Sequence, residues 1–449
     1  MRIAWFSPFP PVRTGIADCS AELVAALRTR GHDIDPYPTA TAHDFPWTHR
    51  QRPYDLVVYQ FGNSSHHDYA WGYALRYPGL VVLHDTHLHH ARAAFLLREQ
   101  RAADYRAEFA WNHPDAPADA AELAVHGFDS HLLYRWPMVR SLVTSARLTA
   151  VHGEGARREL IASIPDGPTP NSQSRLAERI VSIRLGHGQL VGVEEKAAAR
   201  SSVRVRHGIA DDAVVFGCFG GLTPEKRIPQ VLAALRAIVP YAPSAHLILA
   251  GAAAPHYDVQ QDIAGHQLQE RVTMTGYLDE GDLTAHLAAC DVSLNQRWPS
   301  VGETSGSWLR ALAAGVPTVI TDLVHNADAP SLDPRTWTQN RPKPKAESPK
   351  PVCVAIDILD EDHSLRLAMR RLAQDAALRD QLGRAGRAWW TREHSLEAMV
   401  EDYERVMRQA AARPAEGGEP EDGAPLHLRD AGDHRLSALL APFGIATPL

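Results

Sequence analysis

The chain has 449 residues, of which 45% are hydrophobic and 22% charged, and its formal net charge is −7. This length predicts two or three domains of ordinary size, and the apolar share predicts packed cores. A mildly acidic chain does not favour nucleic acid as the main partner, because binding to a phosphate backbone needs clustered basic charge.

No apolar run approaches the roughly 18 residues that span a bilayer, and the N-terminal stretch lacks the apolar segment of a signal peptide. The cysteines lie far apart and form no Cys-x-x-Cys pair; they are Cys19, Cys218, Cys290 and Cys353. We therefore expect buried free thiols and a cytoplasmic protein.

Strand candidates alternate with amphipathic helical stretches in both halves of the chain. In the first half, strands are predicted at Arg2–Phe6, Asp33–Tyr37, Asp55–Gln60, Leu80–His84 and Leu148–His152. In the second half, they are predicted at Val214–Phe219, His246–Gly251, Val272–Thr275, Asp291–Asn295, Pro317–Thr321 and Val352–Ile356. Apolar strands separated by helices predict parallel sheets covered on both faces, so the expected fold class is α/β with two doubly wound, Rossmann-like domains.

We place the boundary between the domains within Gly186–Ala213, where the hydrophobic periodicity is weak. The predicted organisation is an N-terminal domain over 1–195, a C-terminal domain over 205–395, and a helix over 396–412 that packs back on the N-terminal domain. Residues 413–449 begin with a run of Pro, Gly and acidic residues and predict a disordered tail. Asn340–Pro351 is rich in Pro and Lys and predicts a solvated loop insertion.

Gly15 follows the first predicted strand and three prolines. A helix is predicted over Ala17–Arg30, so Gly15 lies where a strand end meets a helix N-terminus, a place suited to an anion. No Gly-x-Gly-x-x-Gly occurs, so a dinucleotide fingerprint is absent. An ordinary turn glycine is the simpler interpretation of the local sequence.

A second glycine-containing turn follows Val214–Phe219. The helix after it begins between about Lys226 and Pro229, because proline is tolerated only in the first helical turn. Lys226 is thereby placed beside a helix N-terminus, where a cation is unfavourable unless an anion is bound there. This placement favours a phosphate site, with a solvated surface lysine as the alternative. The pattern of a P-loop is missing.

The stretch after the predicted strand Asp291–Asn295 brings together several charged and polar residues that suit ligand binding. Arg297 follows the strand, and a helix is predicted over Ser307–Ala314. Between them lies a loop of small and polar residues: Gly302, Glu303, Thr304, Ser305 and Gly306. The backbone N–H groups of such a loop and the guanidinium of Arg297 suit a diphosphate, whereas Glu303 suits sugar hydroxyls. A plain serine cap with an acidic first turn is the simpler alternative, but it does not explain the whole cluster.

Four segments together resemble the family 4 (group 1) glycosyltransferases of the GT-B fold. They are SPFPPVRTGIADCSAEL (Ser7–Leu23), VVLHDTHLHH (Val81–His90), FGGLTPEKRI (Phe219–Ile228) and NQRWPSVGETSGSWLRALAAGVP (Asn295–Pro317). The resemblance implies two Rossmann-like domains facing across a cleft, with the acceptor on the first and a nucleotide diphosphate sugar on the second. It also implies transfer of a sugar, a hexose in the first instance, with retention of configuration and without a metal or other cofactor. The acceptor is left open: a glycan, a lipid-linked molecule or a small molecule.

The resemblance further implies roles for single residues. His84 matches a histidine near the sugar, and Glu303 matches the first of the family's paired glutamates, so these two are the expected catalytic residues. The expected donor-binding residues are Gly15, Lys226, Tyr277, Arg297, Thr304, Ser305 and Gly306. Among these, Lys226 would neutralise the diphosphate, and Tyr277 lies in the region whose backbone meets the base.

Two positions depart from the family pattern. Gly221 stands where the family commonly has an arginine, and Arg297 is a candidate to replace that charge. The second glutamate, usually a ribose ligand, falls at Arg310 or Ala311. A non-catalytic sugar-nucleotide or glycan-binding protein of the same fold is therefore an alternative to a transferase, and a sugar-nucleotide epimerase or phosphorylase is another.

Two further patterns have simple explanations. HDTHLHH (His84–His90) contains zinc-ligand types, but no second cluster has ligand spacing, and the chain has 24 histidines, so we expect no metal site. Leu88–Arg106 is amphipathic with a basic edge. We expect a helix that faces its own domain, and peripheral contact with the inner face of the membrane is the alternative.

Overall fold

The computed structural model describes residues 1–117, 119–128, 131–165, 176–255, 257–340, 350–414, 423–429 and 440–444. The chain divides into two units, each with its own sheet. The first unit comprises Met1–Ile183, Val301–Thr304 and Val400–Leu449, and the second comprises Arg184–Ser300 and Ser305–Met399. Most of the expected loop insertion at Asn340–Pro351, and most of the expected tail over 413–449, lie outside the described residues.

The first unit is built on six parallel strands in the order β2-β1-β3-β4-β5-β6. They are β1 (Arg2–Phe6), β2 (Asp33–Pro36), β3 (Leu56–Phe61), β4 (Leu80–Leu83), β5 (Leu148–His152) and β6 (Ile180–Ile183). The first five agree with the predicted strands to within one or two residues. The sequence did not predict β6, because this edge strand has four residues and only its two end residues are buried.

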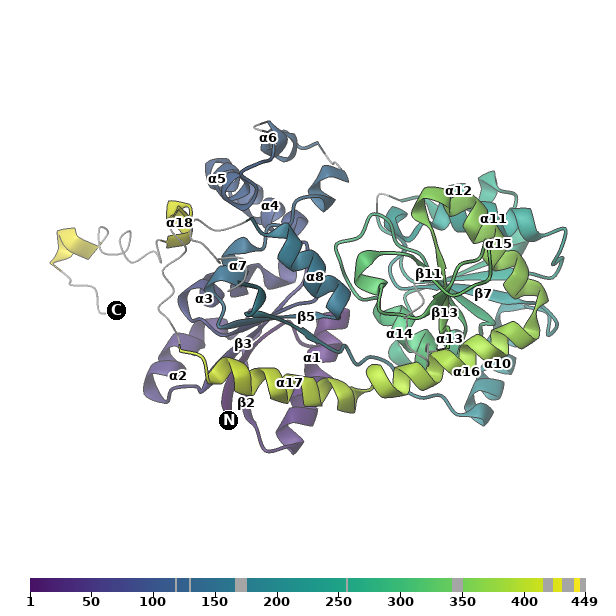
Figure 1. The fold of residues 1–449 in the computed structure, drawn as a ribbon, viewed down its shortest axis with the longest axis horizontal. Coiled ribbons are helices and arrows are strands. Elements are labelled where there is room, and N and C mark those ends of the chain that lie inside the picture. The colour runs from purple at the N-terminus through teal and green to yellow at the C-terminus, as the bar shows by residue number, and fades with distance from the viewer. Residues whose placement is uncertain are drawn as a thin grey trace. The chain divides into compact units, whose positions relative to one another are not determined.

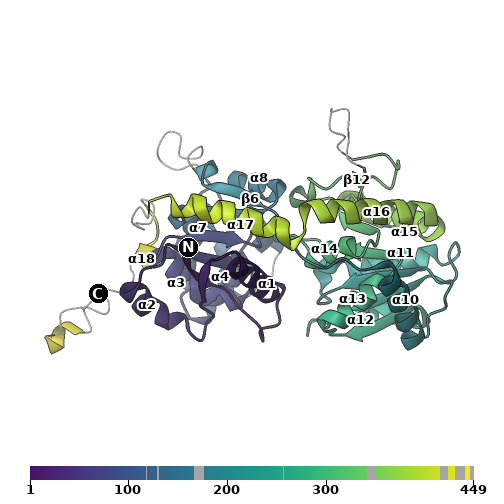
Figure 2. The ribbon, with the colours of Figure 1, turned by 90° about the horizontal axis from the view of Figure 1, so that it is seen from below.

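Helices cover both faces of this sheet, as Figures 1 and 2 show. The helices of the first unit are α1 (Gly15–Thr29), α2 (Phe45–Gln51), α3 (Asp68–Arg76), α4 (His89–Arg98), α5 (Ala102–Asn112), α6 (Ala120–Val125), α7 (Arg140–Ser145), α8 (Glu154–Ser163), α17 (Leu396–Ala411) and α18 (Leu426–Arg429). α3, α7 and α8 share one hydrophobic core with the strands. α17 packs on the opposite face, where Tyr403 stacks on Trp5 with the ring centroids 5.8 Å apart.

The second unit is a seven-stranded parallel sheet in the order β12-β13-β11-β10-β7-β8-β9. Its strands are β7 (Val215–Phe219), β8 (His246–Ala250), β9 (Val272–Gly276), β10 (Val292–Asn295), β11 (Thr318–Thr321), β12 (Ser331–Leu332) and β13 (Cys353–Ile356). All but the two-residue strand β12 were predicted. The strand order runs outward from β7 in both directions, so the direction of winding changes between β7 and β10.

The helices of the second unit form a layer on each face of the sheet (Figure 1). They are α10 (Val193–His207), α11 (Ile228–Ile238), α12 (Val259–Gly265), α13 (Glu280–Ala289), α14 (Gly306–Ala313), α15 (Glu361–Gln374) and α16 (Ala376–Glu393). α11, α12 and α15 share one core, and α10, α13 and α14 share the other. Two doubly wound α/β domains are therefore confirmed.

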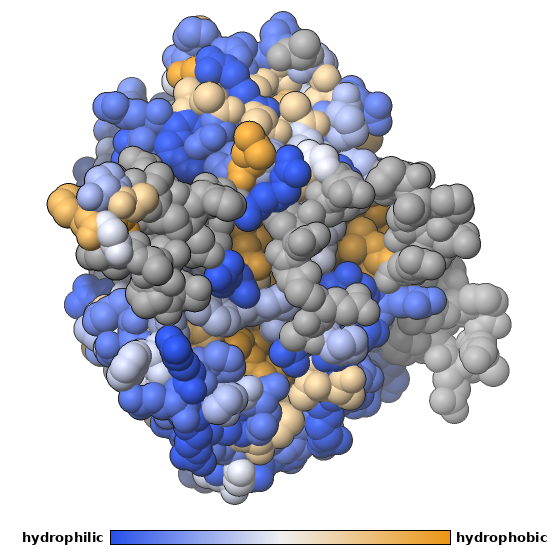
Figure 3. All heavy atoms as spheres, turned by 90° about the vertical axis from the view of Figure 1, so that its left-hand side faces the viewer, coloured by the Kyte–Doolittle hydropathy of each residue, from blue (hydrophilic) through white to orange (hydrophobic). Residues whose placement is uncertain are grey.

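The four cysteines are buried and free, as expected. Within the part of the chain that the structure describes, no helix combines the length and the apolar character that crossing a membrane requires. On the face drawn in Figure 3, hydrophobic residues form small patches among hydrophilic ones. The amphipathic stretch Leu88–Arg106 forms α4 and the first five residues of α5, and its Leu96 and Tyr105 are buried in a hydrophobic cluster of the first unit.

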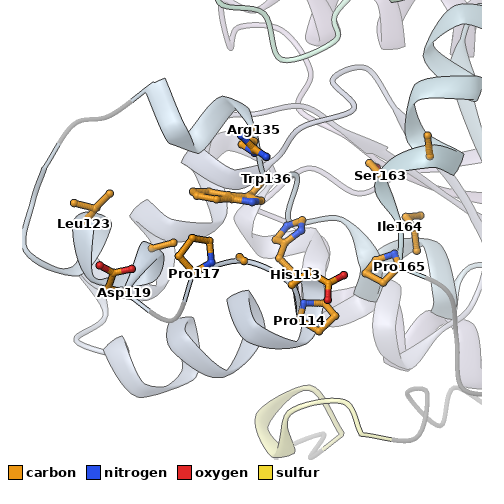
Figure 4. Close-up of a pocket in the computed structure, with 14 residues that line it drawn as sticks. His113, Pro114, Pro117, Asp119, Leu123, Arg135, Trp136, Ser163, Ile164 and Pro165 are labelled. Atoms are coloured by element: carbon orange, nitrogen blue, oxygen red, sulfur yellow. The ribbon is translucent and has the colours of Figure 1, made fainter.

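A cavity of about 640 Å³ lies in the first unit. It lies between the segment after α5, the segment before α7 and the C-terminal end of α8. In Figure 4, Trp136 and His113 occupy its middle, with Leu123 on one side and Ile164 on the other. The ten residues of α8 span about 15 Å from the end of β5 to this cavity. The cavity therefore lies away from the carboxyl ends of the strands, where ligands of such folds bind.

Candidate functional site

A small cleft opens at the carboxyl ends of β7 and β10 in the second unit. These strands pair directly, with Phe216 opposite Val292. They flank the point where the winding of the sheet changes direction, the usual ligand site of doubly wound sheets. The cleft is lined by Cys218, Phe219, Lys226, Leu294, Asn295, Gln296, Arg297, Ser305 and Ser307.

Lys226 reaches this cleft through a tight turn. β7 ends at Phe219, Gly220 follows with a φ of +86°, and a single 3-10 turn over Pro224–Lys226 leads into α11. The Lys226 ammonium donates to the backbone carbonyl of Phe219. A side chain at Gly220 would place its Cβ 2.7 Å from Lys226 Nζ. The glycine therefore permits both the turn and the course of the lysine back over the strand end.

Arg297 is held by side chains at the end of the neighbouring strand β11. Its backbone N–H donates to Thr321 Oγ1 over 3.0 Å, and that hydroxyl donates to Gln296 Oε1, also over 3.0 Å. Gln296 is buried and donates in turn to the Val319 carbonyl over 3.1 Å. The loop that carries Lys226 is joined to this one, because Trp298 N donates to the Glu225 carbonyl over 2.8 Å. Both cations are thus fixed to the same end of the sheet.

The N-terminus of α14 closes the cleft with hydroxyl groups. Ser305 is the N-cap residue, and its Oγ accepts from Trp308 N over 3.4 Å and lies 3.1 Å from Ser307 Oγ. Ser307 Oγ donates to Asn295 Oδ1 over 3.4 Å. The first helical residue, Gly306, packs so closely on His187 that a Cβ would lie 2.8 Å from that ring. The glycine therefore lets the N-terminus of α14 pack against His187.

The electrostatics of the cleft favour an anion. Lys226 and Arg297 are its charged residues, none of the residues lining it is a carboxylate, and the positive end of the α14 dipole points into it. Burial raises the pKa of the Cys218 thiol to about 12, and the Lys226 charge acts against this rise. The Cys218 thiol is therefore neutral at physiological pH and adds no charge to the lining of the cleft. The charge of the cleft suits a phosphate or diphosphate group.

The structure distributes the remaining predicted site residues between the two units. Gly306 adjoins the cleft, but Tyr277 does not line it: the residue is 59% exposed and follows the edge strand β9. Gly15 and His84 lie in the first unit, at the start of α1 and just after β4. A Cβ on Gly62, at the end of β3, would lie 2.4 Å from Ile16, the residue after Gly15. Gly15 therefore approaches the carboxyl ends of the first sheet.

Glu303 and Thr304 lie in Val301–Thr304, a short segment that belongs to the first unit, whereas the residues before and after it belong to the second. Glu303 Oε2 accepts from Val301 N over 3.0 Å, so it organises its own loop. Burial raises the pKa of Glu159, and the negative charge of Glu303 raises it further. Thr304 Oγ1 donates to the His152 carbonyl over 3.5 Å.

Arg310 occupies the position where the resemblance predicted a possible second glutamate. It is buried, its Nε donates to His187 Nε2 over 3.0 Å, and its guanidinium forms an ion pair with Glu280. Burial lowers the pKa of His187 to about 3, with a further contribution from the Arg310 charge. Arg310 is a cation that already pairs with the Glu280 carboxylate, so this position does not present the free carboxylate of the family's second glutamate.

The lining of the cleft also contains three residues that were not predicted to belong to the site: Asn295, Gln296 and Ser307. Their signal was present, since two of them are polar residues at the end of an apolar strand and the third opens a helix. The histidines of HDTHLHH separate: His89 bonds Tyr105 Oη over 2.8 Å, and His84 bonds Gln60 over 2.7 Å. Among the described residues, no three His, Cys, Asp or Glu side chains form a group that could hold a metal ion.

Comparison with known proteins identifies the second unit. Residues 213–332 match the family model "Glycosyl transferases group 1". This span contains β7, Lys226, Arg297 and α14, and therefore the whole cleft. No curated protein sequence matches the chain.

Solved structures show the same fold over nearly the whole chain. HepE of Anabaena, in complex with UDP and glucose, is 14% identical with a TM-score of 0.60, over 91% of this chain and 99% of that one. Sucrose-phosphate synthase of Thermosynechococcus elongatus is 15% identical with a TM-score of 0.61, over 92% and 100% of the two chains. The catalytic domain of starch synthase IV of Arabidopsis thaliana, bound to ADP and acarbose, is 11% identical with a TM-score of 0.62, over 92% and 99%. Residues 213–332 thus match the group 1 glycosyltransferase model, and the chain shares the two-domain α/β fold of these solved structures.

Proposed function

We propose that this glycosyltransferase takes its sugar from a nucleoside diphosphate sugar and binds the diphosphate in the cleft of the second unit. The observation that carries the proposal is the meeting of Lys226, Arg297 and the N-terminus of α14 at the ends of β7 and β10. Two cations and a helix N-terminus match the charge of a diphosphate.

The chemistry of transfer explains why cations are needed there. The bond between the anomeric carbon and the diphosphate oxygen breaks, and its electron pair stays on the oxygen. A new bond forms to an acceptor hydroxyl oxygen, whose proton is released to the leaving phosphate or to water. Fixed cations and N–H groups that stabilise the growing negative charge can lower such a barrier by several kcal/mol, or about 3 kcal/mol for one donor.

The nature of the ligands in related folds supports a diphosphate. HepE is seen with UDP and starch synthase IV with ADP, which differ in the base and share the diphosphate. We propose that the transfer needs no metal, because Lys226 and Arg297 supply positive charge and the cleft offers no carboxylate ligand. Retention of the anomeric configuration, with His84 and Glu303 near the sugar, is part of the proposal through the family resemblance.

A binding experiment with matched variants tests the cleft. Isothermal titration of the full chain with UDP, ADP and GDP should detect one of the three. We expect Lys226→Ala and Arg297→Ala each to weaken that binding by about 10- to 100-fold, which corresponds to roughly 1.4–2.7 kcal/mol. Arg236→Ala, on the exposed side of α11, removes a cation from the same helix and should leave binding unchanged.

Turnover separates the transferase from the non-catalytic alternative. The nucleotide sugar whose nucleotide binds should be consumed, either by transfer to an added glycan acceptor or by slow hydrolysis. Nucleotide binding with no consumption of any nucleotide sugar would favour a sugar-nucleotide binding protein. Full affinity in both the Lys226 and the Arg297 variants would contradict the assignment of the cleft.

A further inference from the structure

Three neighbouring strands of the first sheet each place a polar residue at their carboxyl end. Gln60 is the fifth residue of β3, His84 follows β4 directly, and His152 ends β5. The strand register aligns Gln60 with Val82, and Leu83 with Val151. Because side chains alternate along a strand, Gln60, His84 and His152 all point to the face opposite the core that contains Phe61, Leu83 and Val151.

These residues form one hydrogen-bonded chain. His84 Nε2 lies 2.7 Å from Gln60 Oε1, and His84 Nδ1 lies 3.2 Å from His152 Nε2. The Gln60 amide is oriented with its oxygen towards His84 Nε2, and an amide oxygen can only accept, so His84 Nε2 carries a proton. In the neutral ring, the lone pair on His84 Nδ1 then accepts from the N–H of His152 Nε2. The two partners therefore specify the tautomer of His84 and the orientation of its ring.

The partners are themselves fixed by the fold. Gln60 is 1% exposed and His152 is 4% exposed, whereas His84 is half-buried and reaches the surface of the unit. The hydroxyl of the fully buried Tyr403, on α17, also donates to Gln60 Oε1 over 3.2 Å. The Gln60 carbonyl accepts from His67 Nδ1 over 2.9 Å. A half-exposed imidazole is thus backed by buried polar side chains.

We propose that Gln60 and His152 are positioning residues, which hold His84 as the neutral Nε2–H tautomer in one orientation at the carboxyl edge of the first sheet. This inference rests on the proposed function, in which His84 serves sugar transfer. The transition state of glycosyl transfer carries positive charge on the sugar. An amide behind His84, in place of a carboxylate, provides no charge that would stabilise an imidazolium next to that sugar.

Turnover by two variants of His152 tests the proposal. We expect His152→Ala to lower kcat on the order of tenfold, a usual effect of removing the partner of a functional histidine, with little change in the KM for the nucleotide sugar. His152→Asn keeps an N–H donor and should restore much of kcat. His89→Asn is the matched control, because His89 is equally buried but bonds Tyr105 on another helix. It should retain the kcat of the parent protein.

A spectroscopic measurement tests the tautomer without any turnover. Long-range ¹H–¹⁵N spectra of histidine-labelled full-length protein, assigned with His84→Gln, should show a neutral Nε2–H ring at His84. His152→Ala should shift the His84 Nδ1 signal, and Gln60→Glu should move both nitrogens towards imidazolium values. Thermal unfolding of each variant verifies that it is folded.

The two measurements keep the inference separate from the proposed function. An Nδ1–H tautomer at His84 in the parent protein would overturn the inference, whatever the enzyme transfers. Equal loss of kcat in His152→Ala and His152→Asn, with unchanged His84 signals, would also overturn it. If the parent protein shows the expected spectra but transfers no sugar, the proposed function is contradicted. The tautomer of His84 would then have no role in sugar transfer.

Discussion

Gly220 adopts a backbone conformation that is unfavourable for other residues, and a side chain there would occupy the space next to Lys226. Its φ is +86°, in the left-handed region where a Cβ costs roughly 1–2 kcal/mol. The Cβ would also lie 2.7 Å from Lys226 Nζ, on the path by which the lysine returns over the end of β7. The next residue, Gly221, has no such constraint, because the nearest atom to its Cβ position is 3.9 Å away.

We expect Gly220→Ala to weaken nucleoside diphosphate binding by about tenfold, because Lys226 must move away from the cleft. The same change should lower the free energy of unfolding by roughly 1–2 kcal/mol through backbone strain. Gly221→Ala is the matched control and should change neither quantity measurably. Calorimetry and urea denaturation of both variants measure the two effects. Equal affinities for the two alanine variants would argue that Lys226 does not contact the ligand.

The residues of the cleft differ in how far the sequence predicted them. Lys226 and Arg297 were predictable, because each directly follows a turn or a strand end whose place in a parallel sheet is known in advance. The bond between Ser307 and Asn295 was not, because it joins a helix and a strand whose separation depends on tertiary packing. The resemblance placed the second glutamate at position 310 or 311, but the pairing of Arg310 with Glu280 likewise depends on tertiary packing.

The short helix α18 is held against α5 by contacts between His427 and two carboxylates. His427 Nε2 lies 2.7 Å from Glu108 Oε1, and His427 Nδ1 lies 3.2 Å from an oxygen of Asp104, both on α5. Glu108 is 1% exposed and also pairs with Arg92 of α4. Burial raises the pKa of Glu108, but the Arg92 charge and the bonds from Arg92 and His427 outweigh this and lower it. Four helical residues cannot be stable alone, so these contacts hold the segment.

Replacing His427 should therefore release this segment. We expect His427→Ala to lower the free energy of unfolding by about 1–2 kcal/mol, because Glu108 loses one of its two partners while Arg92 remains. Hydrogen exchange of the amides in Leu426–Arg429 should become fast. Leu426→Ala is the control, since Leu426 is 76% exposed on the same helix. Unchanged protection of these amides in the His427 variant would show that Leu428 and Ala424 hold the segment by apolar packing alone.

Elements with a long apolar run were predictable, and elements stabilised by neighbours were not. Eleven strand candidates correspond to strands, and those of β1, β3, β4, β8 and β13 contain four or more consecutive apolar residues, which suit a doubly covered sheet. β6 and β12 carry no such run and exist because an adjacent strand completes their hydrogen bonds. The same holds for α18, whose binding to α5 depends on two carboxylates more than 300 residues away in sequence.

Both units bury histidines that stay neutral in the folded protein. Burial lowers the pKa of His67 to about 4, that of His89 to about 3 and that of His187 to about 3. His67 and His89 belong to the first unit and His187 to the second. In the unfolded chain a histidine takes up its proton near pH 6.5. Between that pH and about 4, the unfolded state therefore binds more protons than the folded state.

The free energy of unfolding should consequently fall as the pH falls from 6.5 towards 4. Each buried histidine contributes at most about 1.4 kcal/mol per pH unit, so a loss of several kcal/mol is expected by pH 5. Urea denaturation at pH 7.5, 6.5, 5.5 and 5.0 measures this loss above the range in which most carboxylates titrate. His89→Gln should reduce the slope, whereas His43→Gln, whose side chain is 74% exposed, should leave it unchanged. A free energy of unfolding that stays constant over this range would show that water reaches these imidazoles in the folded protein.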